Sequence, residues 1–120
     1  YIEGASNAGL KVGVYWFSYA TTAEKAAQEA RKCVETIAPY KNSITYPVFF
    51  DYEYDSVKYA NSNGVIITKN SATQIANSFI NTIKSRTSKS HFFLLMSWII
   101  KVTIFLLLYI IILTYFYSLI

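Results

Sequence analysis

The sequence predicts an α/β fold in which parallel strands alternate with helices. Two apolar runs, at residues 10–17 and 48–54, are rich in aromatic and β-branched side chains, which is typical of buried strands. Residues 21–38 and 71–86 carry apolar side chains at helical spacing. Strands and helices that alternate in this way form βαβ units, with parallel strands and right-handed crossovers.

The first part of the chain reads as the end of a helix followed by a strand. Gly9 is placed to end the helix in the left-handed conformation that glycine adopts without strain. The strand at residues 10–17 is nearly continuous in apolar character, as in strands buried on both faces. Gly13 in its middle predicts a bend or the close approach of another backbone segment.

The two internal helices carry start and stop signals. The first begins at the capping-box pattern TTAE, residues 21–24, and Pro39 ends it. Its inward face is rich in alanine, and Cys33 at the edge of that face is expected to be a small buried thiol. The second begins at the similar pattern SATQ, residues 71–74. The polar segment at residues 55–63 is expected to be irregular, with at most one helical turn.

The run VFFDYEYD, residues 48–55, ends a strand in three acids at alternate positions. Asp51 and Glu53 share one face of this strand, because strand side chains alternate between faces. Their Cβ atoms are expected roughly 7 Å apart, and carboxyl pairs separated by about 5 to 9.5 Å hydrolyse glycosidic bonds. Two negative charges at the end of a buried strand cost free energy, and residues arranged in this way are often functional. The alternative is a solvated strand end, with Asp55 as the cap of a helix or turn.

Aromatic side chains gather at the carboxyl end of the first strand, where parallel α/β folds place their active sites. Tyr15, Trp16 and Tyr19, and also Tyr52 and Tyr54 on the second strand, could stack on sugar rings. The alternative is that they belong to the core, because strand aromatics are more often buried.

Composition argues against several other functions. Before residue 92 the chain has ten Lys and Arg against seven Asp and Glu, and no basic run indicates nucleic-acid binding. A single cysteine excludes an intramolecular disulfide. His91 has no other His or Cys near it, so neither a zinc site nor another cofactor is expected. The chain begins at Tyr1 and not at Met, which suggests a fragment. Its start shows no signal-peptide pattern.

The composition divides the chain into a domain at residues 1–88 and a hydrophobic tail at residues 89–120. Residues 102–120 contain no charge, and at about 1.5 Å per residue they are long enough to cross a bilayer. A transmembrane helix would leave the preceding domain on the cytoplasmic side. The alternative is that the tail comes from a misread frame in AT-rich DNA.

Three features in this order resemble glycoside hydrolase family 25, the Chalaropsis-type lysozymes, which are N-acetylmuramidases. These features are the run GLKVGVY at residues 9–15, a helix that ends near Pro39, and the Asp-x-Glu pattern of Asp51 and Glu53. The resemblance covers residues 1–86, and it implies a fragment of a TIM-like (β/α) barrel.

The resemblance also implies a function and a set of site residues. The substrate would be peptidoglycan, cleaved at the β-1,4 links between N-acetylmuramic acid and N-acetylglucosamine. Glu53 would be the general acid that protonates the leaving oxygen. Asp51 would orient or stabilise the substrate's own N-acetyl group and so assist attack by its carbonyl oxygen. Substrate contacts would come from Tyr15, Trp16, Tyr19 and Asp55. Trp16 stands where many members of the family have His.

The resemblance is partial, and this limits the expected activity. The family's barrel uses a further acid on its first strand and another near its last strands, and neither has a counterpart here. Two predicted strands cannot close an eight-stranded barrel, so we expect little or no muramidase activity from the chain as written. A non-catalytic, membrane-anchored protein and a degenerate gene fragment are the alternatives. The expected location is the membrane if the tail is genuine, and secreted otherwise.

Overall fold

The computed structural model describes residues 1–87 and 92–96 of the 120-residue chain. The described elements follow one another as α1 (Ile2–Asn7), β1 (Val14–Phe17), α2 (Ala23–Ile37), the 3₁₀ turn η1 (Ala38–Tyr40), β2 (Val48–Tyr52), α3 (Tyr54–Ser62), α4 (Lys69–Arg86) and β3 (Phe92–Met96). The three described strands form one parallel sheet in the order β1-β2-β3. The predicted parallel α/β arrangement is therefore confirmed.

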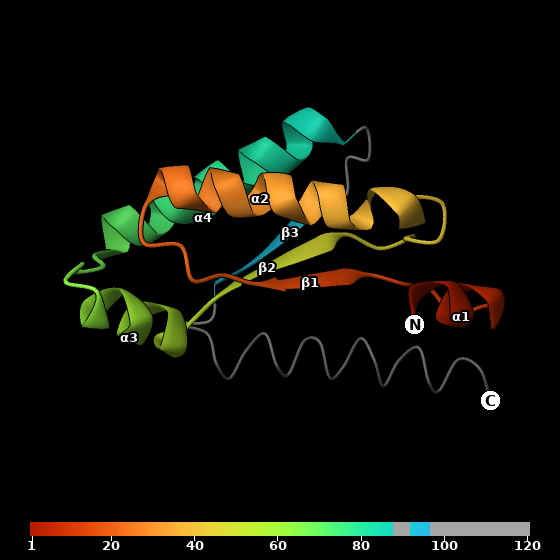
Figure 1. The fold of residues 1–120 in the computed structure, drawn as a ribbon, viewed down its shortest axis with the longest axis horizontal. Coiled ribbons are helices and arrows are strands. Elements are labelled where there is room, and N and C mark those ends of the chain that lie inside the picture. Colours follow the sequence, from red (N-terminus) through yellow and green to blue (C-terminus); the bar gives the residue numbers. More distant parts are fainter. Residues whose placement is uncertain (88–91, 97–120) are drawn as a thin grey trace.

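The sheet has helices on one face. Figure 1 shows α2 and α4 side by side over that face, while α1 and α3 lie at its two ends. Alternate β2 residues, Val48, Phe50 and Tyr52, are buried beneath the two helices. The Phe50 ring packs against Phe79 of α4, with 4.5 Å between their centroids. None of the described helices covers the opposite face, and this face carries the candidate site.

Small side chains let α2 and α4 pack closely. Both helices bury alanines, namely Ala26, Ala30, Ala72 and Ala76. The Ser78 hydroxyl donates a hydrogen bond of 2.6 Å to the Ala23 carbonyl oxygen between the helices. Cys33 is free and fully buried, as predicted, and burial raises the pKa of its thiol to about 11. The thiol is thus a packing group.

The strand β1 is shorter than predicted, because the segment before it makes a different set of contacts. The Val12 carbonyl oxygen accepts hydrogen bonds from the Thr45 and Tyr46 N–H groups, at 2.9 and 2.8 Å. A Cβ on Gly13 would lie 3.1 Å from the Tyr46 Cβ and 3.3 Å from the Pro47 oxygen. The close approach predicted at Gly13 is confirmed, and regular pairing begins only at Val14.

Both predicted capping boxes are displaced along the chain. The N-cap of α2 is Thr22, whose hydroxyl accepts from the Lys25 N–H at 3.2 Å. The N-cap of α4 is Thr68, which exchanges hydrogen bonds with Ser71 at the third helical position. Because a serine hydroxyl can serve at either end of a capping box, the pattern at residues 71–74 did not fix the start of α4.

The segment expected to be irregular is the nine-residue helix α3. It buries only Ser56 and Ala60, which lie one turn apart. An inward face of two small residues gives little apolar periodicity, so the pattern failed to predict the helix. Gly64 follows its end at φ +74°, and Gly9 follows α1 at φ +78°, so the predicted left-handed glycine after α1 is confirmed.

The third strand was not predicted. Phe92–Met96 lies within the predicted hydrophobic tail, but it pairs in parallel with Val48–Tyr52. An apolar run cannot be assigned to strand or helix by periodicity alone, and this run merges into a longer one. The transmembrane helix predicted at residues 102–120 lies outside the described residues. Among residues 1–87 and 92–96, no helix combines the length and the hydropathy needed to cross a membrane.

Candidate functional site

Asp51 is held at the carboxyl end of β2 by contacts from β1. Its side chain is 8% exposed, and its carboxylate accepts a hydrogen bond from the Tyr15 hydroxyl. Phe17 is its partner in the register of the two strands, and the Asp51 carbonyl oxygen accepts from the Ser18 N–H at 2.9 Å. We call the sheet surface formed by Tyr15, Phe17 and Asp51 the acid face.

Glu53 follows directly after β2 and is the N-cap of α3. Its backbone is extended, with φ −134° and ψ −165°, so it continues the alternation of the strand and projects to the side of Asp51. The Glu53 N–H donates to the hydroxyl oxygen of the fully buried Ser56 at 3.1 Å. A carboxylate in this position also interacts favourably with the positive end of the helix dipole.

Tyr15 joins the two acids into one group. Loss of solvent around its hydroxyl, the hydrogen bond to Asp51 and the negative charges of Asp51 and Glu53 raise its pKa to about 12. Because both carboxylates contribute to this rise, the phenol lies within electrostatic reach of both. The shift keeps Tyr15 protonated and able to donate. The structure thus brings together three of the predicted site residues.

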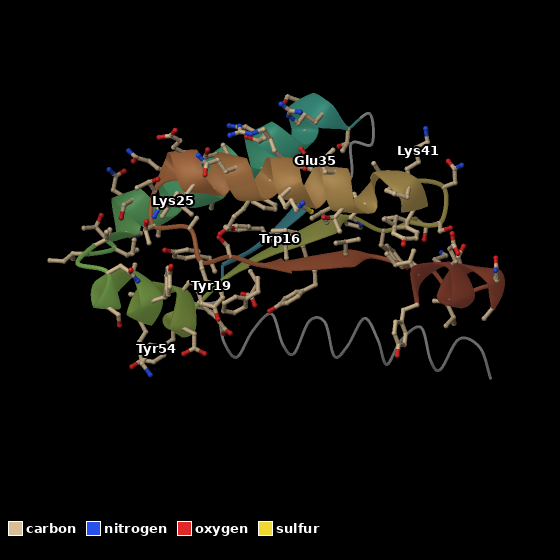
Figure 2. All side chains as sticks on the ribbon, in the orientation of Figure 1. Trp16, Tyr19, Lys25, Glu35, Lys41 and Tyr54 are labelled. Atoms are coloured by element: carbon tan, nitrogen blue, oxygen red, sulfur yellow. The ribbon has the colours of Figure 1, made fainter. Side chains whose placement is uncertain are left out.

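Trp16 lies away from this group, on the helix-covered side of the sheet. Its Nε1–H donates to the Glu29 carboxylate at 3.2 Å, and its ring centroid lies 6.4 Å from that of Phe79. Figure 2 shows Trp16 between β1 and α2. Adjacent residues of a strand face opposite sides, so Tyr15 and Trp16 could not both reach the acid face.

Tyr19 and Asp55 lie at the same end of the sheet as the acids. Tyr19 follows β1 and is half-exposed near α3, as Figure 2 shows. Its ring contacts those of Phe17 and Tyr59, at centroid distances of 5.0 and 5.2 Å. Asp55 is exposed in the first turn of α3, where an acid suits the helix dipole.

Glu29 of α2 was missed by the sequence analysis. Its two oxygens accept separate hydrogen bonds, from the Trp16 Nε1–H at 3.2 Å and from the Tyr19 N–H at 3.1 Å. Burial and the Glu29 charge raise the pKa of Tyr52, whose hydroxyl donates to the Ala20 carbonyl oxygen. Glu29 therefore holds the chain where it leaves β1. In the sequence, the signal that could have pointed to Glu29 is its position next to the buried alanines of α2.

The described residues offer no set of ligands for a metal. No three His, Cys, Asp or Glu side chains within residues 1–87 and 92–96 gather closely enough to hold an ion. The chemistry available at the acid face, together with Glu53 just beyond it, is that of two carboxylates and a phenol.

Paired carboxylates of this kind are the catalytic groups of most glycoside hydrolases. The model of the family "Glycosyl hydrolases family 25" matches residues 1–104. Because the match covers most of the 120 residues, the chain belongs to glycosyl hydrolases family 25, and the predicted resemblance is confirmed. The match includes β3 and so extends beyond the predicted resemblance at residues 1–86. No curated protein and no solved structure matches the chain.

Proposed function

We propose that the chain carries the central part of a muramidase site, which hydrolyses the β-1,4 links between N-acetylmuramic acid and N-acetylglucosamine in peptidoglycan. The observation that supports this best is the grouping of Tyr15, Asp51 and Glu53 at the carboxyl ends of β1 and β2. Family membership supports a glycoside as the substrate class, and the paired carboxylates support acid-assisted cleavage.

Glu53 is the proposed general acid. It transfers its proton to the glycosidic oxygen as the bond between this oxygen and the anomeric carbon breaks. Its backbone is fixed on one side by β2 and on the other by the hydrogen bond to Ser56. This anchoring at the start of a helix holds the carboxyl group in one place while its protonation state changes.

Asp51 is the proposed orienting group. It accepts from the Tyr15 hydroxyl through one oxygen, which leaves other acceptor sites on the carboxylate for the N–H of the substrate's acetamido group. The acetamido carbonyl oxygen then attacks the anomeric carbon as the leaving oxygen departs. Water opens the resulting ring and returns a proton to Glu53. The near-complete burial of Asp51 supports a fixed orientation for this role.

The remaining predicted contacts take different parts in this proposal. Tyr15 and Tyr19 offer exposed ring surface beside the acids, at 61% and 50% exposure. Asp55 is placed to accept hydrogen bonds from sugar hydroxyls. Trp16 supports the site from the opposite side of the sheet through its hydrogen bond to Glu29.

We propose low activity for the 120-residue chain alone. The acid face has no described helix over it, and the Tyr15 ring is 61% exposed. Carboxylates act most strongly on a substrate when water is excluded, because the low dielectric strengthens each electrostatic interaction. The exposure of Tyr15 leaves water at this part of the site, which weakens sugar binding and transition-state stabilisation.

Release of reducing ends from purified peptidoglycan tests the role of Glu53. We expect slow release by the wild-type chain and at least about a hundredfold loss in Glu53→Gln, which cannot donate the proton. Glu35→Gln, at an exposed glutamate of α2, is the matched control and should retain wild-type activity. Release that persists unchanged in Glu53→Gln would show that another group supplies the proton.

Membrane contact through residues 102–120 is a separate proposal, supported by the uncharged run in the sequence. A protein anchored in this way stays with the membrane fraction during carbonate extraction. Recovery of the chain in the carbonate-soluble fraction would argue against an anchor, and a secreted location would then be proposed on the basis of the family.

A further inference from the structure

A row of three aromatic rings begins directly beside Asp51. Phe17 is the register partner of Asp51 on β1 and shares the acid face with it. The Phe17 ring contacts Tyr19 at 5.0 Å, and Tyr19 contacts Tyr59 of α3 at 5.2 Å between centroids. We call Phe17, Tyr19 and Tyr59 the aromatic row. It connects the end of β1 to the helix that Glu53 begins.

The outer rings of this row are not used to build the core. Tyr19 is 50% exposed and Tyr59 is 45% exposed, whereas the core rings Phe50 and Phe79 are each 1% exposed. Tyr19 and Tyr59 meet edge to face, with 64° between their planes. This geometry stabilises the pair while leaving ring surface open to another molecule. Exposed aromatic surface that is contiguous in this way marks a binding region.

The place of the row matches the place of a ligand in parallel α/β folds. Tyr19 lies just beyond the carboxyl end of β1, and Tyr59 lies on the helix that follows the carboxyl end of β2. Ligands of these folds bind outside the carboxyl ends of the strands. The row therefore continues from the acid face to the carboxyl end of the sheet, where folds of this class bind their ligands.

We propose that Tyr19 and Tyr59 form a sugar-binding subsite, which stacks the pyranose ring next to the ring bound at Asp51 and Glu53. This inference rests on the proposed function. A pyranose has an apolar C–H face that packs on an aromatic ring, and hydroxyl groups around its edge. A tyrosine offers a matching apolar ring and a polar tip. The subsite assigns a role in binding to Tyr59, which was not among the predicted site residues.

Binding of a tetrasaccharide made of two N-acetylglucosamine–N-acetylmuramic acid repeats tests the subsite, by calorimetric titration of the full 120-residue chain. We expect Tyr59→Leu to raise the Kd up to about tenfold, as the loss of one aromatic stacking contact implies. Tyr59→Phe keeps the ring and should stay within about twofold of the wild type. Tyr19→Leu removes the other ring and should weaken binding like Tyr59→Leu.

Tyr46→Leu is the matched control. Tyr46 is 42% exposed, similar to Tyr59, but it lies before β2 at the opposite end of the sheet. We expect it to bind as the wild type does. Wild-type affinity in Tyr59→Leu and Tyr19→Leu, with binding still weakened by Tyr15→Phe, would overturn the subsite and leave the proposed function intact. Failure of the wild-type chain to bind the tetrasaccharide would overturn both.

Discussion

The hydrogen bond from Tyr15 to Asp51 links the two strands that carry the candidate site. Asp51 is nearly buried, and an acid in such a place needs a partner for its charge. Tyr15 supplies a neutral donor, and the two nearby carboxylates keep it protonated by raising its pKa. The phenol is thus kept neutral and able to donate its hydrogen bond to Asp51.

The Tyr15 contact predicts a dependence of stability on alkaline pH. The folded-state pKa is raised from 10.0 to about 12, so the folded state favours the neutral phenol. This contribution to stability is fully present below about pH 10 and is lost as the pH rises through about 12. Between about pH 10 and about pH 12, the free energy of unfolding should therefore fall more in the wild type than in Tyr15→Phe. Urea unfolding at each pH measures this difference.

Both chains keep every other titratable group, including Cys33 and Tyr52, whose pKa values are also raised. Their contributions cancel in the difference between wild type and variant. Parallel stability curves for the two chains between about pH 10 and about pH 12 would contradict the role given to Tyr15.

The position of a site residue could be predicted where the alternation of side chains along a strand determines its face. Asp51, Glu53 and Tyr15 follow from alternation along two strands, and the structure places them together. Alternation also puts Trp16 on the face opposite Tyr15, but it does not predict the contact between Trp16 and Glu29. Their contact joins a strand to a helix thirteen residues away, and neither pattern specifies which side chains meet across that interface.

The helix α4 shows how one side chain joins a helix to the sheet. Phe79 is 1% exposed, and its ring lies 4.5 Å from Phe50 of β2 and 6.4 Å from Trp16 of β1. Both strands therefore depend on this ring for their packing beneath the helix layer. The acid face lies on the reverse of the same two strands, so the packing of α4 positions the site indirectly.

Phe79→Ala is expected to lower the free energy of unfolding by about 3 to 5 kcal/mol, through lost burial and the cavity left behind. Urea unfolding followed by circular dichroism measures this change. Ile66→Ala is the control, because Ile66 is 83% exposed and its truncation should change stability by no more than about 0.5 kcal/mol. A change of less than about 1 kcal/mol in Phe79→Ala would contradict the packing described.

A helix could be predicted where its apolar residues recur at regular helical spacing. The long amphipathic helices α2 and α4 were expected, with errors at their starts, where hydroxyl side chains allow several caps. Helix α2 also ends at Ile37, one residue earlier than predicted. The helix α3 was not expected, because it buries only Ser56 and Ala60. Because α3 was not predicted, Tyr59 could not be assigned to a helix face and was not predicted as a site residue.

The described part of the molecule has two unlike sides. Helices α2 and α4 cover one face of the sheet (Figure 1). The acids and the aromatic row occupy the opposite face and its carboxyl end. The parallel topology followed from the alternation of strands and helices. The strand β3 did not, because its residues belong to a long apolar run in which strand and tail look alike.

The most direct test maps the amide chemical-shift changes of the 120-residue chain during titration with the N-acetylglucosamine–N-acetylmuramic acid tetrasaccharide. Binding at the acid face predicts that the largest changes fall at Tyr15, Asp51 and Glu53. Amides on the outer surface of α2, such as those of Lys25 and Glu35, should stay unchanged. Changes confined to that outer surface, or none at saturating sugar, would contradict the proposed site.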